Sequence, residues 1–145
     1  MIEAVNTENL DEILPLIRQY QQFYRAANID DERNRAFFGQ FADSHERGIQ
    51  HLYRVDGVAA GFSTVYFNFS SAAARPVAVL NDLFVAQPYR RRGIATELVR
   101  HAAAQVAEQG YDHLHWLTQR SNKKAQRLYD ALGARSSEWL FYSLS

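Results

Sequence analysis

The stretch that decides the fold runs from Val77 to Thr96 and reads VAVLNDLFVAQPYRRRGIAT. Its first half is apolar and strand-like, and three arginines followed by Gly93 and Ala95 begin a helical pattern. A helix start leaves its first backbone N–H groups without intrahelical partners and carries the positive end of the helix dipole. Small residues at 93 and 95 keep these N–H groups accessible, while Arg90–Arg92 add positive charge. The segment therefore predicts a phosphate- or diphosphate-binding helix start.

Composition sets the class of protein. The 145 residues fit one domain spanning 1–145, and 16 basic against 16 acidic residues give a net charge of zero. This balance argues against a nucleic-acid partner or an anionic membrane surface as partner. The absence of cysteine excludes disulfides, thiolate zinc sites and a cysteine nucleophile. No window approaches the roughly 20 apolar residues that span a bilayer, so we expect a cytoplasmic protein without a membrane partner.

Hydrophobic periodicity predicts the elements before the deciding stretch. Ile2–Val5 has the pattern of a short strand, and apolar residues from Leu10 recur at helical spacing despite Pro15. A second helix is expected over Asp31–Arg47. Two strands, Gln50–Val55 and Val58–Phe67, flank the dipeptide Asp56-Gly57, which is a strong signal for a tight hairpin turn.

The elements after the hairpin alternate between strand and helix. Val77–Val85 is predicted as a strand, and Ile94, Leu98, Ala102 and Val106 mark one face of a helix that ends at Gly110. The remaining segments predict a strand over His113–Thr118, a helix over Ser121–Leu132 and a closing strand over Glu138–Leu144. The strand-helix-strand unit implies a right-handed crossover between parallel strands.

The segments Leu80–Val85 and Tyr89–Thr96, together with Asn122, Ala125, Leu128-Tyr129 and Leu132-Gly133, resemble the GNAT superfamily of acyl-CoA-dependent N-acetyltransferases. The resemblance covers nearly the whole chain. It implies an α/β (mixed α+β) fold whose central mixed, mostly antiparallel sheet has six to seven strands and about four helices. The expected order is β-α-α-β-β-β-α-β-α-β.

The resemblance also implies an acetyl-CoA site without a metal. In the family, the pattern Gln/Arg-x-x-Gly-x-Gly/Ala binds the diphosphate of coenzyme A, and here it falls on Arg90, Gly93 and Ala95. The preceding strand would pair with the pantetheine arm, Asn122 would help to hold that arm, and Tyr129 would protonate the departing thiolate. The implied cosubstrate-binding residues are Leu83, Phe84, Val85, Arg90, Arg91, Arg92, Gly93, Ile94, Ala95, Thr96, Asn122 and Ala125.

Aminolysis of a thioester requires an uncharged amine, a polarised carbonyl and a route for the proton. Because an amine with a pKa of about 10 is mostly protonated near neutral pH, a carboxylate is needed, and Asp82 is the candidate. Strand alternation would place Leu80, Asp82 and Phe84 on one face. Backbone N–H groups near Phe84 and Val85 would polarise the carbonyl. Asp82 could instead hold a cationic substrate, cap a turn or pair with an arginine, and Tyr129 could be a core aromatic residue.

His113 and His115 share a strand face, but no third metal ligand is apparent, so we expect packed or surface histidines and no metal. The glycine patterns of a nucleophile elbow, a Walker loop or a dinucleotide fold are missing.

The sequence says less about the substrate that would accept the acetyl group. Tyr20, Tyr24, Asn81, Asp82 and Trp116 are the candidate substrate-binding residues. The resemblance is nearest to the diamine and polyamine acetyltransferase branch, which implies a small-molecule amine of diamine, polyamine or amino acid type, and a homodimer. Asn81 stands where an acidic residue is common in that branch. The alternatives are acetylation of a protein lysine or amino terminus, and a non-catalytic coenzyme A-binding sensor.

Overall fold

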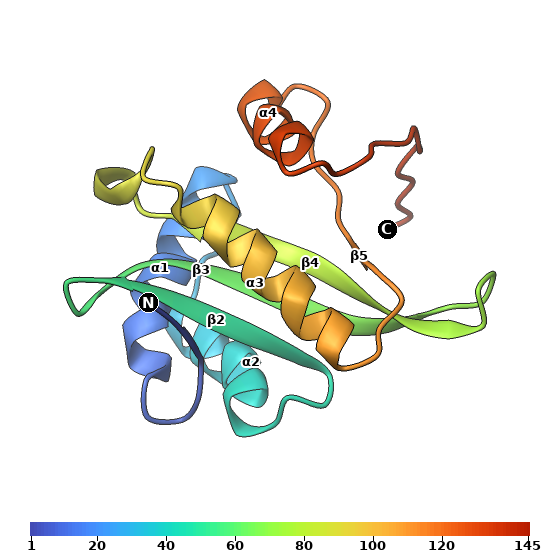
Figure 1. Cartoon of the computed structure of the whole chain (residues 1–145). Coiled ribbons are helices and arrows are strands. Elements are labelled where there is room, and N and C mark those ends of the chain that lie inside the picture. Colours follow the sequence, from blue (N-terminus) through green and yellow to red (C-terminus); the bar gives the residue numbers. More distant parts are fainter.

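Five strands lie side by side in sequence order in the computed structural model, which describes residues 1–145 (Figure 1). They are β1 (Ile2–Ala4), β2 (Gly48–Val55), β3 (Val58–Ser70), β4 (Arg75–Val85) and β5 (Leu114–His115). The first four pair antiparallel, and β5 runs parallel to β4. The predicted mixed, mostly antiparallel sheet is therefore confirmed.

Four α-helices cover the two faces of this sheet and one end of it. They are α1 (Leu10–Phe23), α2 (Asp31–Asp43), α3 (Ile94–Glu108) and α4 (Lys123–Ala131), and a short 3₁₀ helix, η1 (Gln87–Tyr89), precedes α3. One buried cluster packs α1 and α2 against one face, and two others pack α3 against the opposite face. Figure 1 shows α3 across the near face, α1 and α2 behind it, and α4 beyond the end of β5.

Local sequence explains the best-defined elements. Asp30 caps α2, because its carboxylate accepts a 2.9 Å hydrogen bond from the backbone N–H of Arg33. Asp56 and Gly57 both have positive φ, 49° and 77°, as a two-residue hairpin turn requires. The predicted buried face of α3, from Ile94 to Val106, is confirmed.

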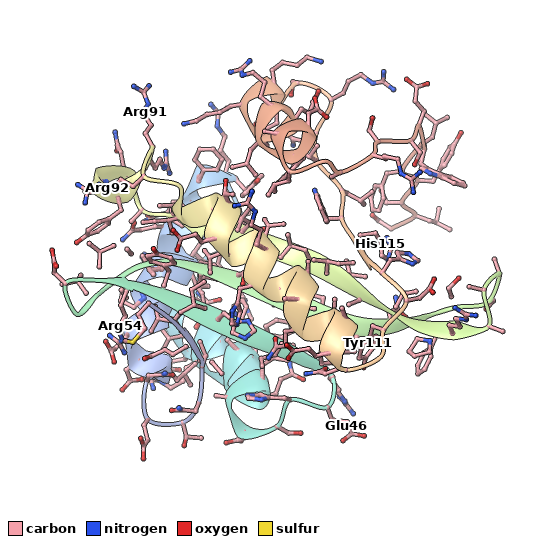
Figure 2. All side chains as sticks on the ribbon, viewed as in Figure 1. Glu46, Arg54, Arg91, Arg92, Tyr111 and His115 are labelled. Carbon is pink, nitrogen blue, oxygen red and sulfur yellow. The ribbon has the colours of Figure 1, made fainter.

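One buried arginine fixes α1 to the sheet. Arg54 on β2 donates to Glu3 on β1 at 2.7 Å and to Glu12 on α1 at 2.9 Å, and its side chain is only 15% exposed (Figure 2). Such a bidentate, shielded guanidinium holds its partners more firmly than a surface ion pair does. The first turn of α1 is thereby held against the sheet, and Tyr20, near the other end of the helix, packs against the rings of Phe62 and Phe84.

Two predicted elements are shorter in the structure. The second helix ends at Asp43 and not at Arg47, because Ser44 is already extended and Gly48 begins β2. The strand expected over His113–Thr118 keeps only Leu114 and His115, since β5 leaves β4 after two paired residues.

The expected closing strand, Glu138–Leu144, is also wrong in this structure, and the sheet has five strands where six to seven were predicted. Aromatic composition favours a strand only where a neighbouring edge can pair with it. Here the tail meets no such edge, and Trp139, Phe141 and Tyr142 are at least 80% exposed.

A buried histidine beneath α3 makes stability depend on pH. His51 is 1% exposed, its ring lies 4.5 Å from that of His101, and its Nδ1 has no hydrogen-bond partner. Burial chiefly, helped by His101 and His45, lowers the pKa of His51 from 6.5 to about 4. The unfolded chain therefore binds the proton first, so this contribution to stability is present above pH 6.5 and is lost as the pH falls towards 4.

We predict that the free energy of unfolding falls less between pH 7 and pH 5 in His51→Gln than in the wild type. The difference should be about 2 kcal/mol. Urea denaturation at the two pH values measures it, with His115→Gln as the control at an exposed histidine. Equal pH dependence in His51→Gln and wild type would contradict the assignment.

Candidate active site

The turn before α3 presents a run of free backbone donors. Arg91 and Gly93 both have positive φ, 65° and 79°, and Gly93 is the residue that caps the helix. The first hydrogen bond of α3 runs from the N–H of Glu97 to the carbonyl of Gly93, at 3.0 Å. The N–H groups of Ile94, Ala95 and Thr96 thus lie before the first helical bond and donate to no protein acceptor. This is the geometry of an anion-binding helix start.

The turn before α3 is also open to solvent. A Cβ added to Gly93 would meet no heavy atom within 4 Å, and the residue is exposed. The acidic residue in the first turn, Glu97, accepts a hydrogen bond from the hydroxyl of Tyr53 at 2.7 Å. An anion can therefore approach the free donors from solvent while the nearest carboxylate is held by the sheet.

The three arginines of the segment have different environments. Arg91 and Arg92 are exposed (Figure 2), and the guanidinium of Arg92 lies 5.6 Å from the ring centroid of Tyr89. Arg90 is engaged by its own chain: its Nε donates to the carbonyl of Val85 at 2.8 Å, and its guanidinium lies 5.6 Å from the ring centroids of Phe23 and Phe84. Two of the three charges predicted to meet a phosphate are thus free to do so, and the third braces the end of β4.

The edge of β4 that faces β5 is open along its second half. Pairing with β5 stops at Val79, whereas pairing with β3 continues to Val85. The N–H of Ala86 donates to the carbonyl of Ala60 on β3. Alternation therefore turns the backbone of Phe84 towards β3 and that of Leu83 and Val85 towards the open edge. An extended amide chain can pair with this edge as an added strand. Of the three predicted strand residues, Leu83 offers its N–H and carbonyl there, and Val85 offers only its N–H, because Arg90 occupies its carbonyl.

A β-bulge interrupts β4 at Asn81. Thr64 of β3 pairs with Asp82, but the next residue, Val65, pairs with Leu80, which leaves Asn81 as the extra residue. The predicted alternation is therefore wrong at this point. Leu80 packs on the α3 side, whereas Phe84 packs with α1 and α2.

Asp82 lies buried at the bulge, with 5% of its surface exposed. The Nδ2 of Asn81 donates to its carboxylate at 3.1 Å, and the hydroxyls of Thr64 and Tyr20 are near enough to favour its charged form. Burial raises the pKa of Asp82, and these hydrogen bonds oppose the rise. A carboxyl group with a raised pKa, next to a cleft, can take up a proton more readily than an exposed one.

The network behind Asp82 includes residues that sequence reasoning missed. The Nε2 of Gln50 donates to the hydroxyl of Thr64 at 2.8 Å, which frees the hydroxyl hydrogen of Thr64 for Asp82. Burial, with the charge of Asp82, raises the pKa of Tyr66 to about 12 and that of Tyr20 further. Only the register of β2, β3 and β4 brings these residues together, so no local motif could have identified Gln50 or Thr64.

An aromatic cleft lies at the bulge. Tyr20 and Tyr24 come from the end of α1, Trp116 follows β5, and Tyr129 is on α4. The Trp116 and Tyr129 rings meet at 5.1 Å, and those of Tyr20 and Tyr24 at 4.9 Å. The remaining lining residues are Leu80, Asn81, Leu83, Leu117 and Thr118. The structure therefore brings the catalytic candidate Tyr129 together with four of the five predicted substrate-binding residues, and Asp82 lies behind Tyr20 and Asn81.

Tyr129 is half-buried in this cleft. Burial, and to a smaller degree Tyr24, raises its pKa, so the hydroxyl keeps its proton at neutral pH. Asn122 caps α4, where its Oδ1 accepts from the N–H of Ala125 at 3.2 Å, and its amide nitrogen remains free for another acceptor. A phosphate cradle, an open strand edge and a cleft with a proton donor thus follow one another along β4.

These features suit a ligand with an anionic group at one end and an extended arm. Residues 13–134 match the acetyltransferase (GNAT) family, so the chain belongs to this family and is an acyltransferase enzyme. It is 33% identical to the uncharacterized N-acetyltransferase YhfO of Bacillus subtilis, over 91% of this chain and 87% of the relative.

A second relative and a solved structure agree with this assignment. The chain is 28% identical to the thialysine N-epsilon-acetyltransferase of Bos taurus, over 93% of this chain and 84% of the relative. The crystal structure of a probable acetyltransferase superposes with a TM-score of 0.88 at 28% identity, over 100% of this chain and 97% of the other. The mixed α/β fold of the GNAT family is thereby confirmed.

No group of three or more His, Asp or Glu side chains is placed to hold a metal ion. No helix has both the length and the apolar character needed to cross a membrane.

Proposed function

We propose that residues 1–145 form one N-acetyltransferase domain that moves an acetyl group from acetyl-CoA to the primary amine of a small molecule. The observation that carries this proposal is the run of unpartnered N–H groups at Ile94, Ala95 and Thr96, in line with the open edge of β4 and the cleft at Tyr129. These groups match the two parts of coenzyme A. Backbone N–H donors suit its diphosphate, and an open strand edge suits its amide-containing pantetheine arm.

Each part of the site has a role in binding the thioester. Gly93 to Thr96 would hold the diphosphate through backbone N–H groups, with Arg91 and Arg92 adding charge at the rim. Leu83 and Val85 would pair with the pantetheine arm, and the free amide of Asn122 would assist from α4. Since Arg90 already bonds the carbonyl of Val85, its role is to brace the strand.

The reaction balances without a covalent enzyme intermediate. The ammonium first loses a proton, for which the buried Asp82 is the acceptor, directly or through water. The amine nitrogen then bonds to the carbonyl carbon of the thioester, and the carbon–sulfur bond breaks. The nitrogen loses its surplus proton to water, and this proton replaces the one that Tyr129 gives to the thiolate. The departing thiolate takes a proton from the hydroxyl of Tyr129, whose raised pKa keeps that proton in place until then.

Thiol release tests this proposal. We expect the purified protein to release coenzyme A from acetyl-CoA when small primary amines are added, with the acetylated amine identified by mass spectrometry. Transfer to peptides but to no small amine would favour a protein acetyltransferase instead. Tight binding of coenzyme A, with no release above hydrolysis for any acceptor, would favour a non-catalytic sensor.

The acceptor of diamine, polyamine or amino acid type and the cytoplasmic location stay predictions.

The homodimer also stays a proposal, and the tail supports it. Trp139, Leu140, Phe141 and Tyr142 are 76–85% exposed, which is more apolar surface than a monomer usually leaves in water. Light scattering should give twice the monomer mass, and a monomer at working concentration would contradict it.

A further inference from the structure

The lining of the aromatic cleft carries no charge of its own. Its nine residues include no Asp, Glu, Lys, Arg or His. Four of them, Tyr20, Tyr24, Trp116 and Tyr129, are aromatic residues that can offer a negative π face to a cation. The cleft is therefore attractive to an ammonium group but provides no partner for a second charge.

A buried negative charge lies behind the wall of the cleft. Asp82 is covered by Asn81, whose Nδ2 donates a hydrogen bond to its carboxylate, and by Tyr20, whose hydroxyl is near the carboxylate. Its field adds to the attraction of the rings for a cation at the bulge. Asp82 lies beside the bulge residue, Asn81. If the pantetheine arm follows β4, the amine meets the thioester at this point.

The rest of the lining is uncharged: three leucines, Asn81 and Thr118. Leu80, Leu83 and Leu117 would surround the stem of an acceptor whose nitrogen lies among the rings. A charged group on that stem, of either sign, would lose water without gaining a partner. A larger groove lies apart from the cleft, between α1 and α2. Four of its five charged residues form the ion pairs Arg18–Asp31 and Arg35–Asp11, and the fifth is Glu32.

We infer that the acceptor is a monocation: a primary amine whose only charge is the reacting ammonium, carried on an uncharged stem. This inference rests on the proposed N-acetyltransferase function and narrows its substrate class. It departs from the diamine, polyamine or amino acid acceptor that the family resemblance implies, because each of those substrates carries a second charge.

Three acceptors of equal length test the inference: pentylamine, 1,5-diaminopentane and 5-aminopentanoate. They share one reacting amine on a five-carbon stem and differ only in the group at the far end. Because an unpaired charge is costly to bury, kcat/KM for pentylamine should exceed that for each of the other two by about tenfold or more. Equal or better turnover of either charged analogue would overturn the inference and leave the acetyltransferase function intact. Failure of every small amine would overturn both.

The contribution of the rings is measured at Tyr24, which is 49% exposed and therefore tolerates replacement. Tyr24→Phe keeps the π face and Tyr24→Leu removes it, so the KM for pentylamine should be about fivefold higher in the leucine variant. Phe69→Leu, at a ring 81% exposed on β3, is the matched control and should leave KM unchanged. Equal KM values in the two Tyr24 variants would contradict binding of the ammonium by the rings.

Discussion

Gly93→Val should weaken acetyl-CoA binding by about a hundredfold or more, which corresponds to about 2.7 kcal/mol. The reason is twofold. The valine side chain would stand over the free N–H groups, each of whose bonds to a charged phosphate contributes about 1.5–3 kcal/mol. It would also be strained at a φ of 79°, which a β-branched residue rarely adopts. Isothermal titration calorimetry measures the change.

The matched control is Gly57→Val in the hairpin turn between β2 and β3. Gly57 has nearly the same φ, 77°, and its added Cβ would likewise meet nothing within 4 Å. Both variants should lose similar stability in urea denaturation, but only Gly93→Val should lose affinity for acetyl-CoA. Equal affinity in the two variants would show that the diphosphate lies elsewhere.

Tyr129→Phe should lower kcat about a hundredfold, because it removes the proton donor to the departing thiolate. The ring and its contact with Trp116 remain, so the dissociation constant for acetyl-CoA should change by no more than about twofold. Stopped-flow or steady-state thiol release gives kcat, and calorimetry gives the dissociation constant.

The control for this substitution is Tyr111→Phe. Tyr111 stacks on Phe67, at the far end of α3 from the cradle, and lies outside the cleft (Figure 2). Removing the hydroxyl of Tyr111 should leave kcat within about twofold of the wild type, because substitutions away from a functional site usually have small effects. If Tyr129→Phe retained full turnover across the pH range, another group or water would have to protonate the thiolate.

The sequence was sufficient for the parts of the fold that depend on local chemistry. The Asp56-Gly57 turn, the apolar face of α3 and the small residues at the start of that helix each follow from a few neighbouring residues. The family pattern extends this to Tyr129 and Asn122, which the structure places on α4 beside the end of β4. Their catalytic and binding roles stay predictions until the variants are measured.

The bulge could not be predicted, because it depends on how β4 pairs with β3. Regular alternation puts Leu80 and Phe84 on the same face, but the extra residue Asn81 separates them. The pairing of β2, β3 and β4 also brings Gln50 and Thr64 behind Asp82, and the packing of α1 on the sheet brings Tyr20 next to it. Such a network is visible only once the register is known.

The length of β5 and the state of the tail depend on tertiary contacts too. The apolar run around Leu114 has strand character, but a strand continues only while its neighbour stays within hydrogen-bonding distance, and β5 turns away after His115. This divergence opens the edge of β4. The departure from the predicted sheet thus creates the proposed path for the pantetheine arm.

The most direct test of the central claim is the crystal structure of the complex with acetyl-CoA. We predict the diphosphate oxygens within hydrogen-bonding distance of the N–H groups of residues 93–96, with the arm running along Leu83 and Val85 towards Tyr129. A nucleotide bound away from the start of α3, or an arm that avoids the open edge of β4, would contradict the account.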